Sequence, residues 1–175
     1  MEEEYLKTTD NVQPHVIESL VRKYWKDIWN FAFVLTNKYD AADDIAQDTF
    51  VKAFLSLESF RGESTVKTWL LKICRNQAMN YKRSAFIRKM VSFPANRKVG
   101  EQASAESEYF QGVMLDEIWR TLLSLPRHYR EVLVLELRYG LSIAEAARIL
   151  NVAEGTVKSR LNRARTHMRR KIRGG

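Results

Sequence analysis

Apolar residues recur three or four positions apart along most of this 175-residue chain, and only 7 glycines and 3 prolines interrupt them. This spacing lines one face of an α-helix with apolar side chains, whereas a half-buried strand needs strict alternation. The pattern therefore predicts an all-α fold. The expected helices cover residues 16–37, 40–54, 66–84, 113–123, 130–138, 143–150 and 154–172.

Helical periodicity fails in the middle of the chain. Pro94 and Gly100 lie there beside a piece rich in glutamine, serine, alanine and glutamate. Such composition is typical of a flexible linker between domains. We therefore expect two small helical domains, 14–85 and 113–173, joined by a flexible linker over 86–112.

The C-terminal third of the chain has the pattern of a helix-turn-helix. Ser142 and Glu145 have the spacing of a capping box, which starts a helix, and Asn151 tolerates the left-handed backbone that ends one. The second helix of such a motif is the one that enters a DNA major groove. We therefore expect DNA binding at this end of the chain. The polar and basic residues that this helix presents are Thr156, Lys158, Ser159, Arg160, Arg163 and Arg165.

Positive charge is concentrated in two segments of the chain, whose formal net charge is +8. Residues 1–60 hold 6 Lys/Arg and 11 Asp/Glu, whereas 61–91 hold 8 and 1, and 152–175 also hold 8 and 1. Two separated basic segments favour contacts at two places along one extended polyanion, such as DNA. The alternative is that both are solvated helix faces, an interpretation that suits the middle segment better than the one on the recognition helix.

The cysteine content, the length of the apolar runs and the N-terminal residues bear on the cellular compartment of this protein. Cys74 is the one cysteine, which excludes a disulfide framework, and no apolar run reaches the about 18 residues that cross a bilayer. The acidic start, Met1-Glu2-Glu3-Glu4, is unlike a signal peptide. We expect a cytoplasmic protein.

Residues able to support catalysis are scattered. His15, His128 and His167 are far apart and lack the spacing of metal ligands, and Cys74 has no histidine near it in the sequence. A glycine-rich phosphate-binding loop is also missing from the sequence. We expect no enzyme, no catalytic residue, no metal site and no cofactor.

The expected helix over 40–54 is acidic. Asp44, Gln47 and Asp48 lie within about one turn of each other and predict a docking face for a basic or polar partner helix. The alternative is that Asp43 and Asp44 only complement the positive end of the helix dipole.

The expected helix over 66–84 combines basic residues with aromatic and amide side chains. Basic residues hold phosphates, and exposed aromatic or amide groups stack on or read unpaired bases. With Phe60 in the preceding loop, this combination favours single-stranded over duplex DNA, although Trp69 is the kind of residue that more often belongs to a core.

Three blocks in this order resemble bacterial sigma factors. Asp43-Asp44-Ile45-Ala46-Gln47-Asp48-Thr49-Phe50 resembles the helix by which they bind core RNA polymerase. Phe60-Arg61-Gly62-Glu63-Ser64 followed by Thr68-Trp69-Leu70 resembles their promoter-opening domain. Leu125-Pro126-Arg127 and Gly155-Thr156-Val157-Lys158-Ser159-Arg160-Leu161-Asn162-Arg163-Ala164-Arg165 resemble their second DNA-binding domain. With its size and two-domain plan, the chain is similar to the extracytoplasmic-function group, group 4, over about residues 15–172.

The resemblance implies a function and named site residues. It implies promoter-specific transcription initiation in an extracytoplasmic stress or signal response, with domain 14–85 serving the polymerase and the −10 element and domain 113–173 the −35 element. The polymerase contacts would be the clamp of the largest subunit and the flap, the clamp being bound by Asp43, Asp44, Gln47, Asp48 and Phe50. The −10 contacts would come from Phe60, Arg61, Ser64, Thr65, Lys67, Asn76, Asn80, Lys82 and Arg83. The −35 contacts would come from Glu154, Thr156, Lys158, Ser159, Arg160 and Arg163. The resemblance also implies an anti-sigma factor, which in this group is often bound to the membrane, and no small-molecule substrate.

Two other classes of protein fit parts of the sequence. A stand-alone DNA-binding regulator would have a similar helix-turn-helix, but it needs neither the 43–50 block nor the 60–70 block. A helical adaptor with a basic face would bind acidic protein or membrane and would show no sequence preference on DNA. In that case charge reversal at Arg160 would matter no more than at Lys171.

Overall fold

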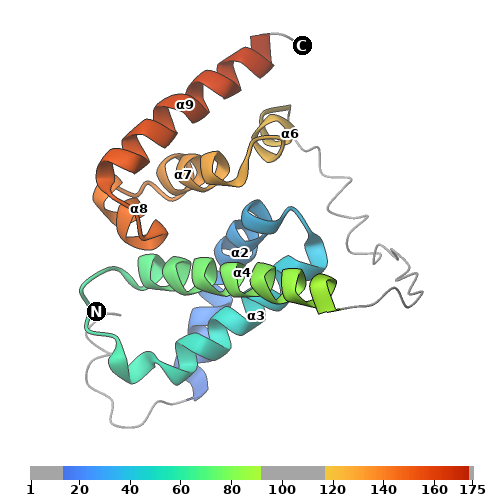
Figure 1. Ribbon diagram of the computed structural model, residues 1–175. Helices are drawn as coiled ribbons and strands as arrows, with labels where there is room; N and C mark the ends of the chain where they lie inside the picture. Colours follow the sequence, from blue (N-terminus) through green and yellow to red (C-terminus); the bar gives the residue numbers. More distant parts are fainter. Residues whose placement is uncertain (1–13, 92–116, 174–175) are drawn as a thin grey trace.

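The computed structural model describes residues 14–91 and 117–173, and all the regular structure in these ranges is helical (Figure 1). The elements are α2 (Pro14–Thr36), α3 (Tyr39–Leu55), the 3-10 helix η1 (Leu57–Ser59), α4 (Val66–Val91), α6 (Glu117–Leu123), α7 (Arg127–Leu137), α8 (Ile143–Leu150) and α9 (Glu154–Arg173). The all-α expectation is confirmed.

Helices α2, α3 and α4 pack together as an N-terminal unit. On α2, Ile28, Phe31 and Leu35 recur at the predicted spacing and are completely buried. Ile45 of α3 and Leu70 of α4 meet them in the same core. Full burial of each such side chain is worth about 1.5–3 kcal/mol, so these contacts set how the three helices lie against one another.

Helix α4 continues to Val91, beyond residue 84, where the periodicity suggested an end. Residues 85–91 contain neither glycine nor proline, and Pro94 is the first residue that disfavours further helix. Ile87, Met90 and Val91 also continue the three- and four-residue spacing of apolar residues, so the predicted end was wrong. The rest of the expected linker, 92–112, and the expected helical residues 113–116 lie outside the described residues.

Helices α6 to α9 form a C-terminal unit. Val132 and Leu135 of α7, Ile149 of α8, and Val157 and Leu161 of α9 are buried in its core. Helix α7 begins earlier than expected from the sequence. Pro126 immediately precedes it, and the fixed backbone of proline suits the start of a helix.

The helix-turn-helix of α8 and α9 is confirmed in detail. The hydroxyl of Ser142 accepts a hydrogen bond from the backbone N–H of Glu145 at 3.3 Å, and the Glu145 carboxylate accepts one from the backbone N–H of Ser142 at 2.9 Å. At the other end of α8, Asn151 has a left-handed backbone with φ of 52°. These two local signals set the length of α8 and the turn into α9.

The two units contact each other. Helix α7 lies against α2, and α8 lies against α4 (Figure 1). Tyr139 meets Phe31 edge to face, with ring centroids 5.9 Å apart. Buried apolar residues from both units belong to one continuous cluster. The sequence contained no signal for this arrangement.

Candidate nucleic-acid and partner interface

Helix α3 presents an exposed acidic face. Asp43, Asp44, Gln47 and Asp48 are all exposed, as expected of a docking face. The carboxylate of Asp43 also accepts a hydrogen bond from the indole N–H of Trp29. Phe50 is different, because its side chain is 5% exposed and belongs to the core. Position 50 lies on the side of α3 that packs against α2, so Phe50 lies beneath the exposed face, and its role in polymerase binding stays a prediction.

The exposed face of α3 continues with apolar residues that were not in the expected set of polymerase contacts. Val51 is 58% exposed and Leu55 is 72% exposed. Asp44, Asp48, Val51 and Leu55 follow the four-, three- and four-residue spacing of one helix face. This spacing in the sequence could have found them, because buried positions on α3 follow a different register. The face therefore combines carboxylates at one end with apolar surface at the other.

The loop before α4 exposes fewer of its expected DNA-contacting side chains than the sequence suggested. Phe60 is 7% exposed and packs on Trp69, with ring centroids 4.9 Å apart. Its side chain is therefore buried in this arrangement, and its role at the −10 element stays a prediction. The hydroxyl of Thr65 accepts a hydrogen bond from the backbone N–H of Thr68 at 3.2 Å and so caps α4. Arg61 is exposed and Ser64 is half-buried.

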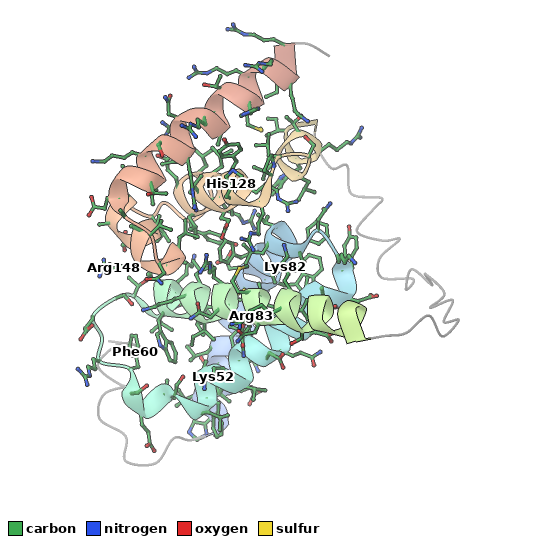
Figure 2. All side chains as sticks on the ribbon, in the orientation of Figure 1. Lys52, Phe60, Lys82, Arg83, His128 and Arg148 are labelled. Carbon is green, nitrogen blue, oxygen red and sulfur yellow. The ribbon has the colours of Figure 1, made fainter. Side chains whose placement is uncertain are left out.

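Helix α4 divides the other candidate DNA-binding residues between two faces. Asn76, Asn80 and Arg83 follow helical spacing and are exposed. Figure 2 labels Arg83 and its neighbour Lys82 on α4. Lys67 and Lys82 are half-buried on the side of α4 that faces the rest of the protein. Nζ of Lys67 lies 3.0 Å from the carboxylate of Asp27, and Nζ of Lys82 donates a hydrogen bond to the backbone oxygen of Leu35 at 2.9 Å.

A polar cleft of about 640 Å³ separates the exposed faces of α3 and α4. Asp44 and Asp48 line it from α3, and Gln77 and Asn80 line it from α4. The side-chain N–H of Gln77 reaches the backbone oxygen of Asp48 at 3.5 Å, which joins the two helices. The acidic face and the amide-bearing face are therefore neighbours on one side of the N-terminal unit.

Helix α9 has an apolar face and a polar face. Val157, Leu161 and Ala164 are buried against α7 and α8. The candidate residues lie away from this core face: Glu154, Lys158, Ser159 and Arg163 are exposed, and Thr156 and Arg160 are half-buried. Arg165 is paired within its own unit, because its guanidinium donates to both carboxylate oxygens of Glu136 at 2.7 and 2.6 Å.

Sequence comparisons match this chain to sigma factors along most of its length. Residues 20–85 match the model of sigma-70 region 2, and residues 115–168 match the model of sigma-70 region 4. The RNA polymerase sigma factor YlaC of Bacillus subtilis is 32% identical over 158 residues, which cover 89% of this chain and 91% of that one. The extracytoplasmic-function sigma-E factor of Escherichia coli K12 is 33% identical over 138 residues, 74% of this chain and 72% of that one.

The chain is an extracytoplasmic-function sigma factor. It therefore binds core RNA polymerase and promoter DNA, directs promoter-specific transcription initiation and is not an enzyme. The fold agrees with a solved structure of the sigma factor RpoE of Bartonella quintana in complex with the anti-sigma factor NepR. That match has a TM-score of 0.66 at 28% identity and covers 89% of this chain and 96% of the other.

The C-terminal unit of this sigma factor also contains an apolar groove of about 500 Å³ between α6, α7 and α9. Leu137 and Ile118 at its edge are 72% and 55% exposed. Arg138 and Arg169 are among the residues that line it. An apolar floor with basic groups around it suits an amphipathic helix that carries acidic residues. Sequence reasoning missed this groove, because residues from three helices form it.

The cysteine and two of the histidines of the sigma factor are packed against neighbouring residues. Cys74 is completely buried, and burial raises the pKa of its thiol to about 12, so it stays protonated and unreactive. His128 and His167 both pack against Tyr129, with ring centroids 4.2 and 5.2 Å away. Within residues 14–91 and 117–173, none of the helices combines the length and apolar character needed to cross a membrane.

Proposed function

We propose that this protein is a group 4 sigma factor that acts in the cytoplasm in an extracytoplasmic stress or signal response. Residues 14–85 would serve as the domain for polymerase binding and the −10 element, 86–112 as the linker, and 113–173 as the domain for the −35 element. The observation that carries the proposal is that α3, α4 and α9 each present an exposed strip of polar or charged side chains away from the core. Three such strips suit one protein partner and two DNA elements.

The exposed face of α3 is proposed as the site for the clamp of the largest polymerase subunit. Asp43, Asp44, Gln47 and Asp48 offer carboxylates and an amide to a basic or polar helix, and Val51 and Leu55 extend the contact with apolar surface. Charged groups at such an edge favour correct orientation, and apolar groups supply most of the affinity. Phe50 supports this face from beneath by stacking on Trp25, with ring centroids 6.0 Å apart.

The exposed strip of α4 is proposed as the −10 site. Asn76 and Asn80 have amide groups that can read the edges of unpaired bases, and Arg83 can hold a phosphate or stack on a base. Arg61 and Ser64 extend this surface into the loop before α4. Capturing an unpaired base offsets part of the unstacking cost of opening the duplex.

The exposed face of α9 is proposed to read the −35 element as duplex DNA. Thr156, Ser159, Arg160 and Arg163 follow the three- and four-residue spacing of one helix face, with Lys158 and Glu154 beside them. Arginine can form two hydrogen bonds with one guanine edge, worth about 1–3 kcal/mol of discrimination, whereas lysine and serine more often hold phosphates.

The apolar groove of the C-terminal unit is proposed as the site for the polymerase flap. An anti-sigma factor is the other proposed partner. This part of the proposal is supported by the similarity to RpoE of Bartonella quintana, whose solved structure is a complex with the anti-sigma factor NepR. If that inhibitor is bound to the membrane, it would hold this protein at the inner face of the membrane.

Transcription in vitro tests the proposal. Core bacterial RNA polymerase would be supplied with fragmented genomic DNA from the source organism, with and without this protein. We expect discrete start sites that appear only with the protein, and their aligned upstream sequences should contain two conserved elements at a set spacing. Start sites that are the same with and without the protein would contradict the proposal.

Variants then assign the two elements. Asn80→Ala should weaken initiation at promoters with an intact −10 element and should have little further effect where that element is already altered, because it removes contacts to that element only. Arg163→Ala should show the same pattern for the −35 element. Lys171→Ala is the matched control, since Lys171 is exposed near the end of α9 and donates a hydrogen bond to Ser124 at 2.9 Å within its own unit. Equal effects of all three variants would contradict the assignments.

A further inference from the structure

Two histidines lie beside the DNA-reading face proposed for α9, and neither belongs to the expected set of −35 contacts. One of them, His167, continues this face by the four-, three- and four-residue spacing of Thr156, Arg160, Arg163 and His167. Arg160 and His167 are both half-buried, because they lie next to the side of α9 that packs into the core. The face therefore extends one turn farther along α9, and its last member is a histidine.

Tyr129 connects this face of α9 to the first turn of α7. Its ring stacks on the ring of His167, with centroids 5.2 Å apart and an angle of 29° between the planes. The ring of the neighbouring His128 lies 4.2 Å from that of Tyr129. Figure 2 labels His128 on α7, the helix that packs against α9. The row of three rings therefore places His128, which is exposed, at the edge of the DNA-reading face.

The charges around His128 favour an anion. Helices α2, α8 and α9 pack against α7, and α9 supplies a positive charge that acts on His128, through Arg160. On α7 itself, Arg127 adds a second positive charge, and Glu131 acts in the opposite sense. The side chain of Glu131 is only 1% exposed and its Oε1 lies 3.4 Å from Nε of Arg127, so this carboxylate does not offer its charge to the surface. A phosphate that approaches His128 therefore meets positive charge.

His128 is mostly neutral in the free protein near pH 7. Partial burial lowers its pKa below the ordinary value, and the positive charge of Arg160 lowers it further. The ordinary value for histidine is already about 6.5. A phosphate has the opposite effect, because an anion within about 4–6 Å favours the protonated imidazole. DNA binding and proton uptake at this side chain therefore favour each other.

We propose that His128 is a further contact residue for the −35 duplex, contributed by α7, which takes up a proton from solvent as it meets a DNA phosphate. Both ring nitrogens of the protonated imidazole are donors, so the contact holds the DNA backbone and carries no base preference of its own. His167 is a positioning residue, since it acts on His128 through the ring of Tyr129. The inference rests on the proposed −35 role of α9.

The direction of the pH dependence follows from this coupling. The protonated form binds DNA more tightly, so binding tightens as the pH falls, and the gain is complete below the pKa that His128 has in the free protein. A phosphate that raises this pKa by about one unit gives at most about tenfold tighter binding. About fivefold of this gain is expected between about pH 7.5 and about pH 5.5.

The test uses holoenzyme assembled from core polymerase and the full-length chain, at constant ionic strength. Fluorescence anisotropy measures the dissociation constant of a duplex that contains the −35 element taken from the mapped start sites. His128→Gln should bind like the wild type at about pH 7.5 and should gain about fivefold less on acidification, because glutamine cannot take up the proton. Core polymerase is common to both holoenzymes, so its own titration cancels in the ratio of the two gains.

A permanent charge and a distant histidine complete the set of variants. His128→Arg should bind about fivefold more tightly than the wild type at about pH 7.5 and should lack the acid gain, because arginine stays charged. His15→Gln is the matched control, since His15 is exposed on α2 in the other unit, and it should keep the full gain. Equal acid gains for the wild type and His128→Gln would overturn the inference.

Failure of the −35 role itself is distinguished by Arg160→Ala in the same assay. Loss of preference for the −35 duplex over a scrambled duplex supports that role, and an unchanged preference contradicts it, whatever the pH dependence. A preserved preference in His128→Gln is expected in either case, because His128 is assigned to a phosphate. Loss of sequence preference in His128→Gln would contradict that assignment.

Discussion

Asp48 lies in the middle of the exposed face of α3, between Asp44 and Val51. We expect Asp48→Arg to abolish binding to core polymerase, because it places a positive charge where a basic partner helix is expected, and like charges at an interface cost several kcal/mol. Co-purification of the variant with tagged core enzyme measures this. Glu58→Arg makes the same charge change at an exposed position of η1 and should leave binding intact. Normal co-purification of Asp48→Arg would contradict the docking assignment.

Ser142 contributes to stability through its capping box with Glu145. Ser142→Ala should lower the free energy of unfolding by about 1 kcal/mol, since it removes the acceptor for the Glu145 backbone N–H. Urea unfolding followed by circular dichroism measures the loss. Ser124→Ala is a suitable control, because Ser124 is exposed after α6 and caps no helix start: its hydroxyl donates to the backbone oxygen of Thr121 and accepts from the exposed Lys171 of α9.

The same capping box predicts a pH dependence. Hydrogen bonds from the side chain and backbone of Ser142 lower the pKa of Glu145 below its ordinary value. A carboxyl whose pKa is lowered on folding stabilises the protein above the ordinary pKa, and the contribution is lost as the pH falls through the folded value. The effect of Ser142→Ala on unfolding should therefore be larger at about pH 7 than at about pH 3. An effect that grows towards acid would contradict this account.

On α9, we expect the position of a charged residue along the helix to matter more for DNA binding than its charge alone. Arg160→Glu should abolish binding to a −35 duplex, because Arg160 shares a face with Thr156, Ser159 and Arg163. Lys171→Glu makes the same charge change near the end of α9 and should weaken binding only modestly and equally for all sequences. Fluorescence anisotropy with matched and scrambled duplexes at two salt concentrations separates these effects. Equal losses from both variants would favour the basic adaptor over the base-specific reader.

Helix α4 illustrates which part of the proposed −10 site could be predicted from sequence. Its start at Val66 follows from the capping residue Thr65, and its exposed strip of Asn76, Asn80 and Arg83 follows from helical spacing, so local sequence was sufficient. The placement of Lys82 could not be predicted, because its hydrogen-bond partner is Leu35, 47 positions away. Contacts at such separation are set by packing of the whole unit.

At the scale of the whole molecule, the two units are joined through Tyr139, whose hydroxyl donates a hydrogen bond to the backbone oxygen of Asp27. Tyr139→Phe should lower the free energy of unfolding by about 1 kcal/mol, because it removes this hydrogen bond and keeps the ring that packs on Phe31. Urea unfolding measures the loss, with Tyr129→Phe as the control. An unchanged free energy of unfolding for Tyr139→Phe would contradict this account.

The helices, their caps and the distribution of charge could be predicted from the amino-acid sequence alone. These depend on residues a few positions apart: the Ser142–Glu145 pair, the left-handed Asn151 and the apolar spacing of α2 all formed as local rules require. The blocks that resemble sigma factors are also local, and sequence comparison alone placed the chain in that family.

The availability of side chains to partners depends on how the helices pack together, which local sequence does not reveal. Phe50 and Phe60 are in the core, Lys67 is paired with Asp27, and the apolar groove exists only where α6, α7 and α9 meet. The contact of Tyr139 with Asp27 joins positions 112 residues apart. Burial and pairing of this kind depend on how the faces of helices distant in sequence pack together, and the composition of each helix does not determine that packing.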